Sequence, residues 1–170
     1  MRLKHVAVSA LCAVAFWAQA GEVKVAVAAN FTSPMQKIVA SFEQDTGHTA
    51  VVSTGSTGKF YAQIKEGAPF EVFLAADEAT PRKLATEGLA IAAQQFTYAK
   101  GKLVLWSAQP GVVDDQGAVL SKGGFEHLAI ANPKMAPYGA AALEVLTALK
   151  LVPTLTPKIV QGESITQAKQ

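Results

Sequence analysis

Apolar runs of strand length alternate with stretches of helical spacing through the first half of this chain, and this alternation limits the folds it can adopt. The strand-like runs cover residues 22–28, 49–54 and 71–75, and the helical stretches cover residues 34–46, 58–65 and 81–87. The first run is apolar almost throughout, which is typical of a strand covered on both faces. Parallel strands need crossover connections, and helices in these places would supply them. The order therefore predicts an α/β fold with a parallel, doubly wound sheet.

The first helix is expected to begin after Ser33, which we interpret as its N-cap. Pro34 would take the first helical position, and Gln36 stands three residues after Ser33, as in a capping box. Gly47 is expected to end this helix, because glycine readily adopts the left-handed conformation that closes helices.

The second half of the chain has a less regular order. We expect strands at residues 95–100, 102–107, 128–131 and 158–161, an Ala- and Leu-rich helix over 139–150, and a last helix that starts at Ser164. We interpret residues 21–80 as the N-terminal part of a first α/β lobe. Residues 81–170 are interpreted as a second α/β lobe that is incomplete at Gln170. The predicted architecture is thus α/β with two lobes.

Residues 1–20 have the order of a secretory signal peptide. A basic start, an apolar run and a small-residue cleavage signal follow one another at residues 2–5, 6–17 and 18–20. The apolar run is too short to span a bilayer, and the alternative of a buried N-terminal helix lacks an amphipathic period. We therefore expect export to the periplasm and removal of this segment.

Removal of the signal changes the charge balance. Residues 1–20 hold two of the 15 Lys and Arg residues and none of the 13 Asp and Glu residues, so the remaining chain is formally neutral. No basic tract supports a nucleic-acid partner. Cys12 is the only cysteine and leaves with the signal, which excludes disulfides and thiol chemistry from the mature chain.

Four short polar segments each stand between a strand-like run and a helical stretch. They are Asn30–Ser33, Ser56–Gly58, Pro137–Gly139 and Gly162–Ser164. A helix start presents free backbone N–H groups and the positive end of the helix dipole. Several such starts that converge on one point make an oxyanion site without Lys or Arg. The sequence therefore predicts an anion receptor.

Each candidate at these segments also has a plain structural role. Asn30 can donate from its amide or simply cap a turn. Ser56 and Thr57 bring hydroxyls to a helix start, and Tyr138 offers its N–H and its hydroxyl or is a core residue at a turn. Ile165 offers only a backbone N–H, while Ser164 and Gln167 have capping-box spacing, so Ser164 would serve its own helix.

Enzyme chemistry has little support in the sequence. A hydrolase or transferase would use Ser56 or Asp77, and either needs a general base beside it. The residues His48 and His127 are isolated and lack the spacing of metal ligands. Asp77 is better explained as a cap of the Thr80–Pro81 turn. We therefore expect a binding protein and not an enzyme.

At these same segments the chain resembles the periplasmic molybdate-binding proteins of ABC uptake systems. The stretches with this resemblance are VAVAANFT (25–32), GSTGKFYAQI (55–64), GAPFEVFLAAD (67–77), AIANP (129–133) and APYGAA (136–141). Together they extend over essentially everything after the signal. Long collinear motifs of this kind are much more specific than any single loop.

The resemblance implies a type II periplasmic binding protein with two α/β lobes and a hinge. It implies these contacts to the molybdate oxyanion: Asn30, Thr57 with Ser56 as the adjacent candidate, Tyr138, and the backbone N–H of Ile165. The implied partner is the membrane permease of a molybdate ABC transporter, with no cofactor beyond the molybdate or tungstate ligand. Members of the family continue past the position of Gln170, so the resemblance also implies a chain shortened at its C-terminus.

We therefore expect a monomer that binds molybdate, with tungstate as an equivalent ligand, and closes around it. Selectivity over sulfate would come from cavity size, because a rigid cage of donors pairs poorly with a smaller tetrahedron. Two alternatives remain open at this point. One is a truncated remnant without binding activity, and the other is a hydrolase that uses Ser56 or Asp77.

Overall fold

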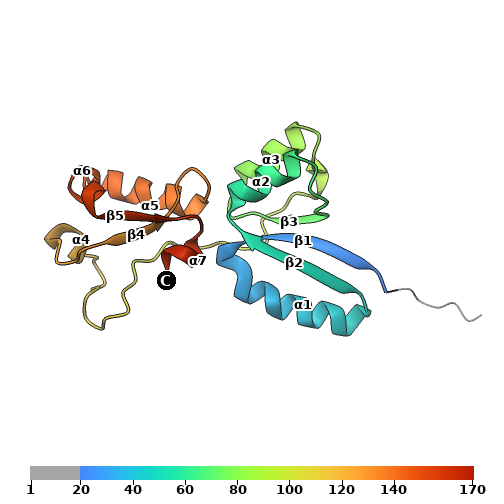
Figure 1. The fold of residues 1–170 in the computed structure, drawn as a ribbon, viewed down its shortest axis with the longest axis horizontal. Coiled ribbons are helices and arrows are strands. Elements are labelled where there is room, and N and C mark those ends of the chain that lie inside the picture. The colour runs from blue at the N-terminus through green and yellow to red at the C-terminus, as the bar shows by residue number, and fades with distance from the viewer. Residues whose placement is uncertain (1–19) are drawn as a thin grey trace, which may run out of the picture.

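The computed structural model describes residues 20–170, which form two β-sheets. Each sheet has parallel strands, and the two sheets lie end to end on either side of a central site (Figure 1). Figure 1 shows the three-stranded sheet on the right and the two-stranded sheet on the left, each with helices packed on it. In both sheets the strands run toward the centre, so their carboxyl ends meet there. The predicted α/β class with parallel sheets is confirmed. Ligand sites in open α/β sheets lie at this edge.

The first sheet has the order β2-β1-β3, and all its neighbours are parallel. Its elements are β1 (Glu22–Ala28), the turn η1 (Ala29–Phe31), α1 (Thr32–Thr46), β2 (Thr49–Gly55), α2 (Thr57–Lys65), β3 (Val72–Leu74), α3 (Ala79–Thr86) and the turn η2 (Ala92–Gln94). Helix α1 covers one face, and α2 and α3 cover the other (Figure 1). The three predicted strands and the three predicted helices are confirmed.

The core of this sheet explains why its central strand reads as continuously apolar. Val25, Ala26, Val27 and Ala28 of β1 are all buried, with neighbours on both sides in the sheet and helices on both faces. Met35 from α1 joins Val25 and Val27 in one buried cluster. Burial on both faces removes the polar alternation that a half-exposed strand would show.

Helix α1 begins earlier than the sequence indicates. Its N-cap is Phe31 and not Ser33, and no side-chain hydrogen bond caps it. The chain leaves β1 through the 3-10 turn Ala29–Phe31, where the Thr32 hydroxyl donates to the Ala29 carbonyl at 3.0 Å. Ser33 therefore already lies inside the helix, so the capping-box interpretation was wrong. The expected end at Gly47, which has φ 69°, is confirmed.

The second sheet pairs β4 with β5 in parallel. Its elements are α4 (Val119–Lys122), β4 (Leu128–Ala131), α5 (Pro137–Ala148), α6 (Val152–Leu155), the turn η3 (Thr156–Lys158), β5 (Ile159–Gly162) and α7 (Ile165–Ala168). Leu120, Leu146 and Leu155 form its buried cluster, and Leu105 packs against them. Helix α7 contacts both strands and also reaches η1 of the first sheet.

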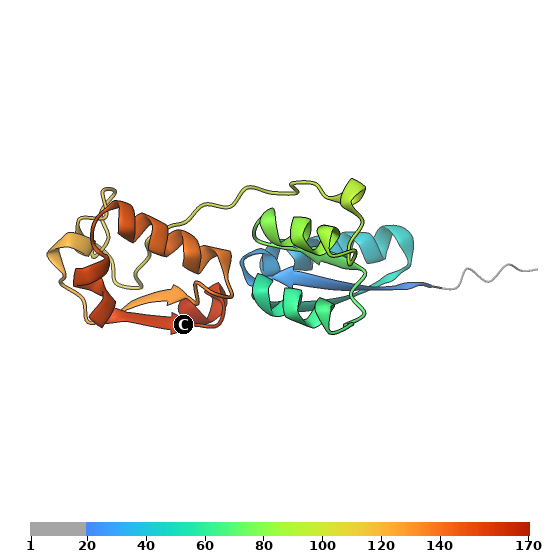
Figure 2. The ribbon, with the colours of Figure 1, turned by 90° about the horizontal axis from the view of Figure 1, so that it is seen from above.

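Residues 95–107 do not form the two strands that the sequence predicts. They run as an irregular segment from the first sheet to the second, which Figure 2 shows from above. Among the described residues this segment has no ladder partner, and a strand exists only where its backbone N–H and C=O groups are paired. Phe96, Val104 and Trp106 remain 78%, 75% and 58% exposed. Their apolar pattern produced the wrong prediction.

The expected signal peptide falls on residues 1–20, of which 1–19 lie outside the described residues. Within residues 20–170, no single helix has the length and apolar character to cross a membrane. Only α5 taken together with residues 152–158 passes on length and composition, as a pair bent by 119°.

Candidate functional site

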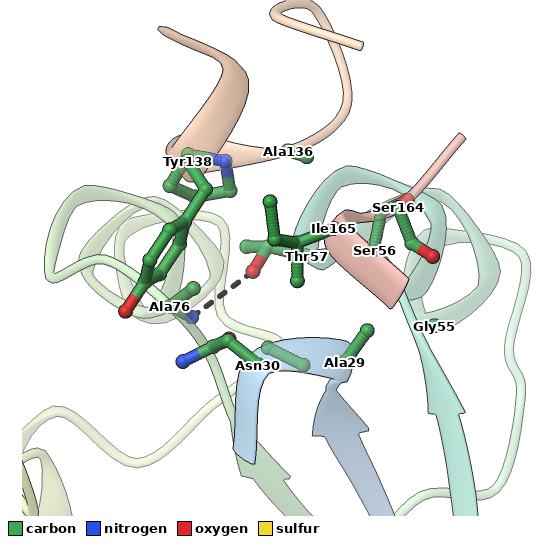
Figure 3. Close-up of a pocket in the computed structure, with 12 residues that line it drawn as sticks. Ala29, Asn30, Gly55, Ser56, Thr57, Ala76, Ala136, Tyr138, Ser164 and Ile165 are labelled. Carbon is green, nitrogen blue, oxygen red and sulfur yellow. Dashed lines mark hydrogen bonds between the residues drawn. The ribbon is translucent and has the colours of Figure 1, made fainter. Parts of the chain in front are cut away.

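Residues that follow the strands of both sheets line one hollow between the sheets (Figure 3). All four polar segments singled out in the sequence contribute to it, and its lining includes every residue proposed as an anion contact: Asn30, Ser56, Thr57, Tyr138 and Ile165. The hollow measures about 210 Å³ when space open to solvent is counted, and the room it leaves for the centre of a water-sized sphere is about 10 Å³. That room is close to the smallest that holds one water molecule.

Among residues 20–170, no charged side chain lines this hollow. Its polar groups are hydroxyls, one side-chain amide and backbone groups, and its other walls are alanine, glycine, proline and isoleucine. Among residues 20–170 no cluster of three or more His, Cys, Asp or Glu residues is placed to hold a metal ion. The arrangement can surround an anion with neutral donors in a partly dry environment, where each such bond is stronger than in water.

Thr57 is the most deeply placed polar side chain of the hollow, only 2% exposed, at the first residue of α2. Its hydroxyl oxygen accepts a hydrogen bond at 3.0 Å from the backbone N–H of Ala76, which follows β3 (Figure 3). The oxygen is thus used as an acceptor within the protein, so the hydroxyl hydrogen is the group left to donate. Thr57 both joins two loops of the first sheet and supplies a donor.

Ser56 occupies the N-cap position of α2 and is 7% exposed. Its hydroxyl makes no capping bond to the helix. Ser56 and Thr57 are the two buried polar side chains in the part of the chain that the structure describes. A hydroxyl at a helix start usually accepts a hydrogen bond from a backbone N–H of the first turn, and the Ser56 hydroxyl does not.

Gly58 brings the two sheets into direct contact beside the hollow. Its N–H donates to the Met135 carbonyl at 2.8 Å, across from α2 to the loop before α5. A Cβ at Gly58 would stand 3.0 Å from both the Cα and the O of Met135, which is tighter than ordinary packing. The missing side chain at Gly58 therefore allows the close approach of another backbone.

Asn30 and Tyr138 approach the hollow from opposite sheets (Figure 3). Asn30 lies in η1 directly after β1 and is exposed. Tyr138 is the second residue of α5, after Pro137, which has no N–H to offer. The start of α5 therefore presents the Tyr138 N–H as its first backbone donor.

Ile165 begins α7, and its neighbour Ser164 is the N-cap. The Ser164 hydroxyl accepts from the Gln167 N–H at 3.4 Å, and the Gln167 side chain accepts from the Glu163 N–H at 2.6 Å. The first bond is the one that the capping-box spacing predicts, while the Gln167 side chain reaches back to the residue before the N-cap. The Ser164 oxygen accepts within its own helix, so its hydroxyl hydrogen and the backbone N–H of Ile165 are the groups of this segment that can donate.

Asp77 does not stand free as a catalytic base. Its two carboxylate oxygens accept from Thr80, one from the backbone N–H at 2.6 Å and one from the hydroxyl at 3.1 Å. The interpretation of Asp77 as a cap of this turn is confirmed. His48 is also engaged elsewhere, since its Nδ1 accepts from the Gly21 N–H at the other end of β1. Neither residue assists the Ser56 hydroxyl.

Sequence reasoning missed Tyr98, which anchors the connecting segment beside the hollow. Its hydroxyl donates to the Ala75 carbonyl at 2.8 Å, and its ring packs edge-on against Phe31 with centroids 4.9 Å apart. The partial burial of the phenol, with the neighbouring Tyr138 phenol as a smaller cause, raises the pKa of Tyr98. The only signal in the sequence was a tyrosine inside a strand-like run, which gives no indication of this contact.

The burial of Tyr98 leads us to expect that this tyrosine ionises late in an alkaline titration. Tyr98 should ionise above the ordinary tyrosine pKa of about 10, and Tyr98→Phe should remove that transition. Because the pKa of Tyr98 is higher in the folded chain than in the unfolded chain, neutral Tyr98 adds to the free energy of unfolding below the unfolded pKa. This contribution is lost as the pH rises through the folded pKa. Absorbance of tyrosinate during an alkaline titration measures this. Retention of the late transition in the Tyr98→Phe variant would contradict the assignment.

Both the sequence and the fold of this chain match known proteins. Residues 23–170 match the family model described as bacterial extracellular solute-binding protein. The chain is 64% identical over 153 residues to the molybdate-binding protein ModA of Azotobacter vinelandii, and 55% identical over 168 residues to that of Rhodobacter capsulatus. These alignments cover 90% and 99% of this chain. The solved periplasmic molybdate-binding protein of Azotobacter vinelandii superposes with a TM-score of 0.84 at 50% identity, over 86% of this chain.

The chain spans 61% and 66% of the length of these two relatives and 64% of the solved chain. The family match itself extends over nearly all the described residues. It agrees with the expectation of a binding protein. The chain belongs to the bacterial extracellular solute-binding proteins.

Proposed function

We propose that this chain binds molybdate, and also tungstate, in the periplasm. The observation that supports it most directly is a hollow where uncharged donors from four separate segments meet, with no charged side chain in its lining. The Azotobacter and Rhodobacter relatives, both named as molybdate-binding, add to this support. Asn30, Ser56, Thr57, Tyr138 and Ile165 are the proposed contacts.

In this proposal the hydroxyls, the Asn30 amide and the backbone N–H groups replace the water around a doubly negative ion. Each charge-assisted bond is worth roughly 1.5–3 kcal/mol. The starts of α2 and α5 add the positive ends of two helix dipoles.

We propose that the two sheets act as lobes that close on the ligand and are then recognised by a membrane permease. The first lobe would extend through α3, beyond residue 80, because α3 packs against α2. The second lobe would begin with α4, after the irregular connection. A monomer suits this scheme, since both halves of the site come from one chain.

Isothermal titration of the 170-residue chain should show binding of molybdate and tungstate, with sulfate and phosphate much weaker. A thermal melt should show a higher midpoint with molybdate, because a ligand that binds only the folded form stabilises it. Sulfate at the same concentration is the matched control. Its smaller tetrahedron should leave buried donors unpaired and produce little shift.

The outcomes separate the alternatives. Equal binding of sulfate or phosphate would contradict selection by cavity size. Aggregation, or a melt that no anion shifts, would instead favour a remnant without binding activity. The exposed Phe96, Val104 and Trp106 are the apolar groups that would drive such aggregation. Turnover of a phosphate or acyl ester, lost on Ser56→Ala, would favour the hydrolase.

A further inference from the structure

We infer that Gly101 is a positioning residue for the proposed anion site, because its missing side chain gives the Tyr138 phenol its place beside the hollow. The inference rests on the proposed function and concerns one contact of that same site. Gly101 belongs to the irregular segment between the sheets and is not among the residues that line the hollow. Its effect would act through Tyr138.

The contact between Gly101 and Tyr138 leaves no room for a side chain. A Cβ at Gly101 would overlap the Tyr138 hydroxyl and would stand 3.1 Å from the ring carbon Cζ. The backbone of Gly101 does not have a positive φ, so alanine is compatible with its conformation. The overlap with Tyr138 is therefore the main cost of an alanine at this position.

The segment that carries Gly101 cannot simply move away. Three residues before it, the Tyr98 hydroxyl is bonded to the Ala75 carbonyl and its ring packs on Phe31. Four residues after it, Leu105 packs against the buried leucine cluster of the second sheet. The chain is thus held on both sides of Gly101, so the crossing segment has little freedom to retreat.

The backbone of Tyr138 is also fixed. It lies at the start of α5, where the next residue, Gly139, packs directly on the backbone of β4 at Ala131. With the segment held and the helix start held, a methyl group at Gly101 must displace the Tyr138 side chain. That displacement moves the phenol from its place at the hollow (Figure 3).

The test is a double-mutant cycle on molybdate binding by the 170-residue chain. Gly101→Ala should weaken molybdate binding by about tenfold, which lies within the range of interaction energies that residues in contact commonly show. Gly101→Ala in a Tyr138→Phe background should cost much less, because the hydroxyl that the methyl overlaps is gone. Gly124→Ala is the matched control, since a Cβ there meets nothing within 4 Å, and its affinity should equal that of the wild type.

A measurement without ligand separates this inference from the proposed function. Nuclear Overhauser contacts between the Gly101 α-protons and the Tyr138 ring should be present in the ligand-free chain. Their absence overturns the inference, as does equal affinity of Gly101→Ala and wild type, or an additive cycle. Failure of the wild-type chain to bind molybdate, with these contacts present, overturns the proposed function and the positioning role that depends on it.

Discussion

Replacing Gly139 by alanine is expected to reduce the free energy of unfolding by about 3 kcal/mol or more, which is at the severe end of overpacking. Gly139 is buried at the third position of α5. A Cβ there would overlap the Ala131 carbonyl oxygen and would lie 2.7 Å from the Ala131 carbonyl carbon. Alanine favours helix by only about 1 kcal/mol over glycine, so the overlap decides the sign.

The neighbours of Gly139 are backbone atoms that cannot rotate away. They end β4, where the Asn132 N–H donates to the Gly162 carbonyl at 2.7 Å and continues the pairing with β5. Urea denaturation followed by circular dichroism measures the loss, with Gly124→Ala as a control expected within about 0.5 kcal/mol of the wild type. Equal midpoints for the two variants would show that α5 does not sit on β4 as closely as described.

Thr57→Ala is expected to weaken molybdate binding by about 10- to 100-fold. The hydroxyl is the proposed donor at the deepest polar position of the hollow, and a bond to a charged group is worth roughly 1.5–3 kcal/mol. The same change removes the acceptor of the Ala76 N–H. That buried donor would then lack a partner, at a cost of about 1–3 kcal/mol, so the melting midpoint should fall as well.

Two further variants separate these effects at Thr57. Thr57→Ser keeps the hydroxyl and should bind molybdate within a few-fold of the wild type. Thr57→Val keeps the shape without the hydroxyl and should lose affinity as Thr57→Ala does. Isothermal titration at one ionic strength compares all three. Wild-type affinity in Thr57→Val would remove this hydroxyl from the proposed contacts.

The part of the site that one sheet supplies by itself could be predicted from general rules. The carboxyl ends of parallel strands lie side by side, so Asn30 after β1 and Thr57 after β2 had to be neighbours once the strands were recognised. That Tyr138 and Ile165 would meet them from the second sheet was implied by the resemblance to a family. Hydrophobic periodicity carries no information about how two sheets face each other.

The prediction failed where pairing depends on distant residues. Residues 95–107 have the composition of strands, yet the described part of the chain offers them no partner, so Phe96 and Trp106 stay exposed. The capping-box interpretation at Ser33 failed for a smaller reason. A 3-10 turn after β1 shifted the start of α1 by two residues, and spacing alone does not register such a turn.

Local periodicity and end signals were thus sufficient for the order of strands and helices in the first sheet, the parallel pairing class, and helix ends such as Gly47 and Ser164. The packed chain alone assigned the partners of three glycines: Met135 for Gly58, Ala131 for Gly139 and Tyr138 for Gly101. A helix or strand pattern records which face of an element is apolar. It does not record what that face meets, because the partner lies far away in the chain and is chosen by packing.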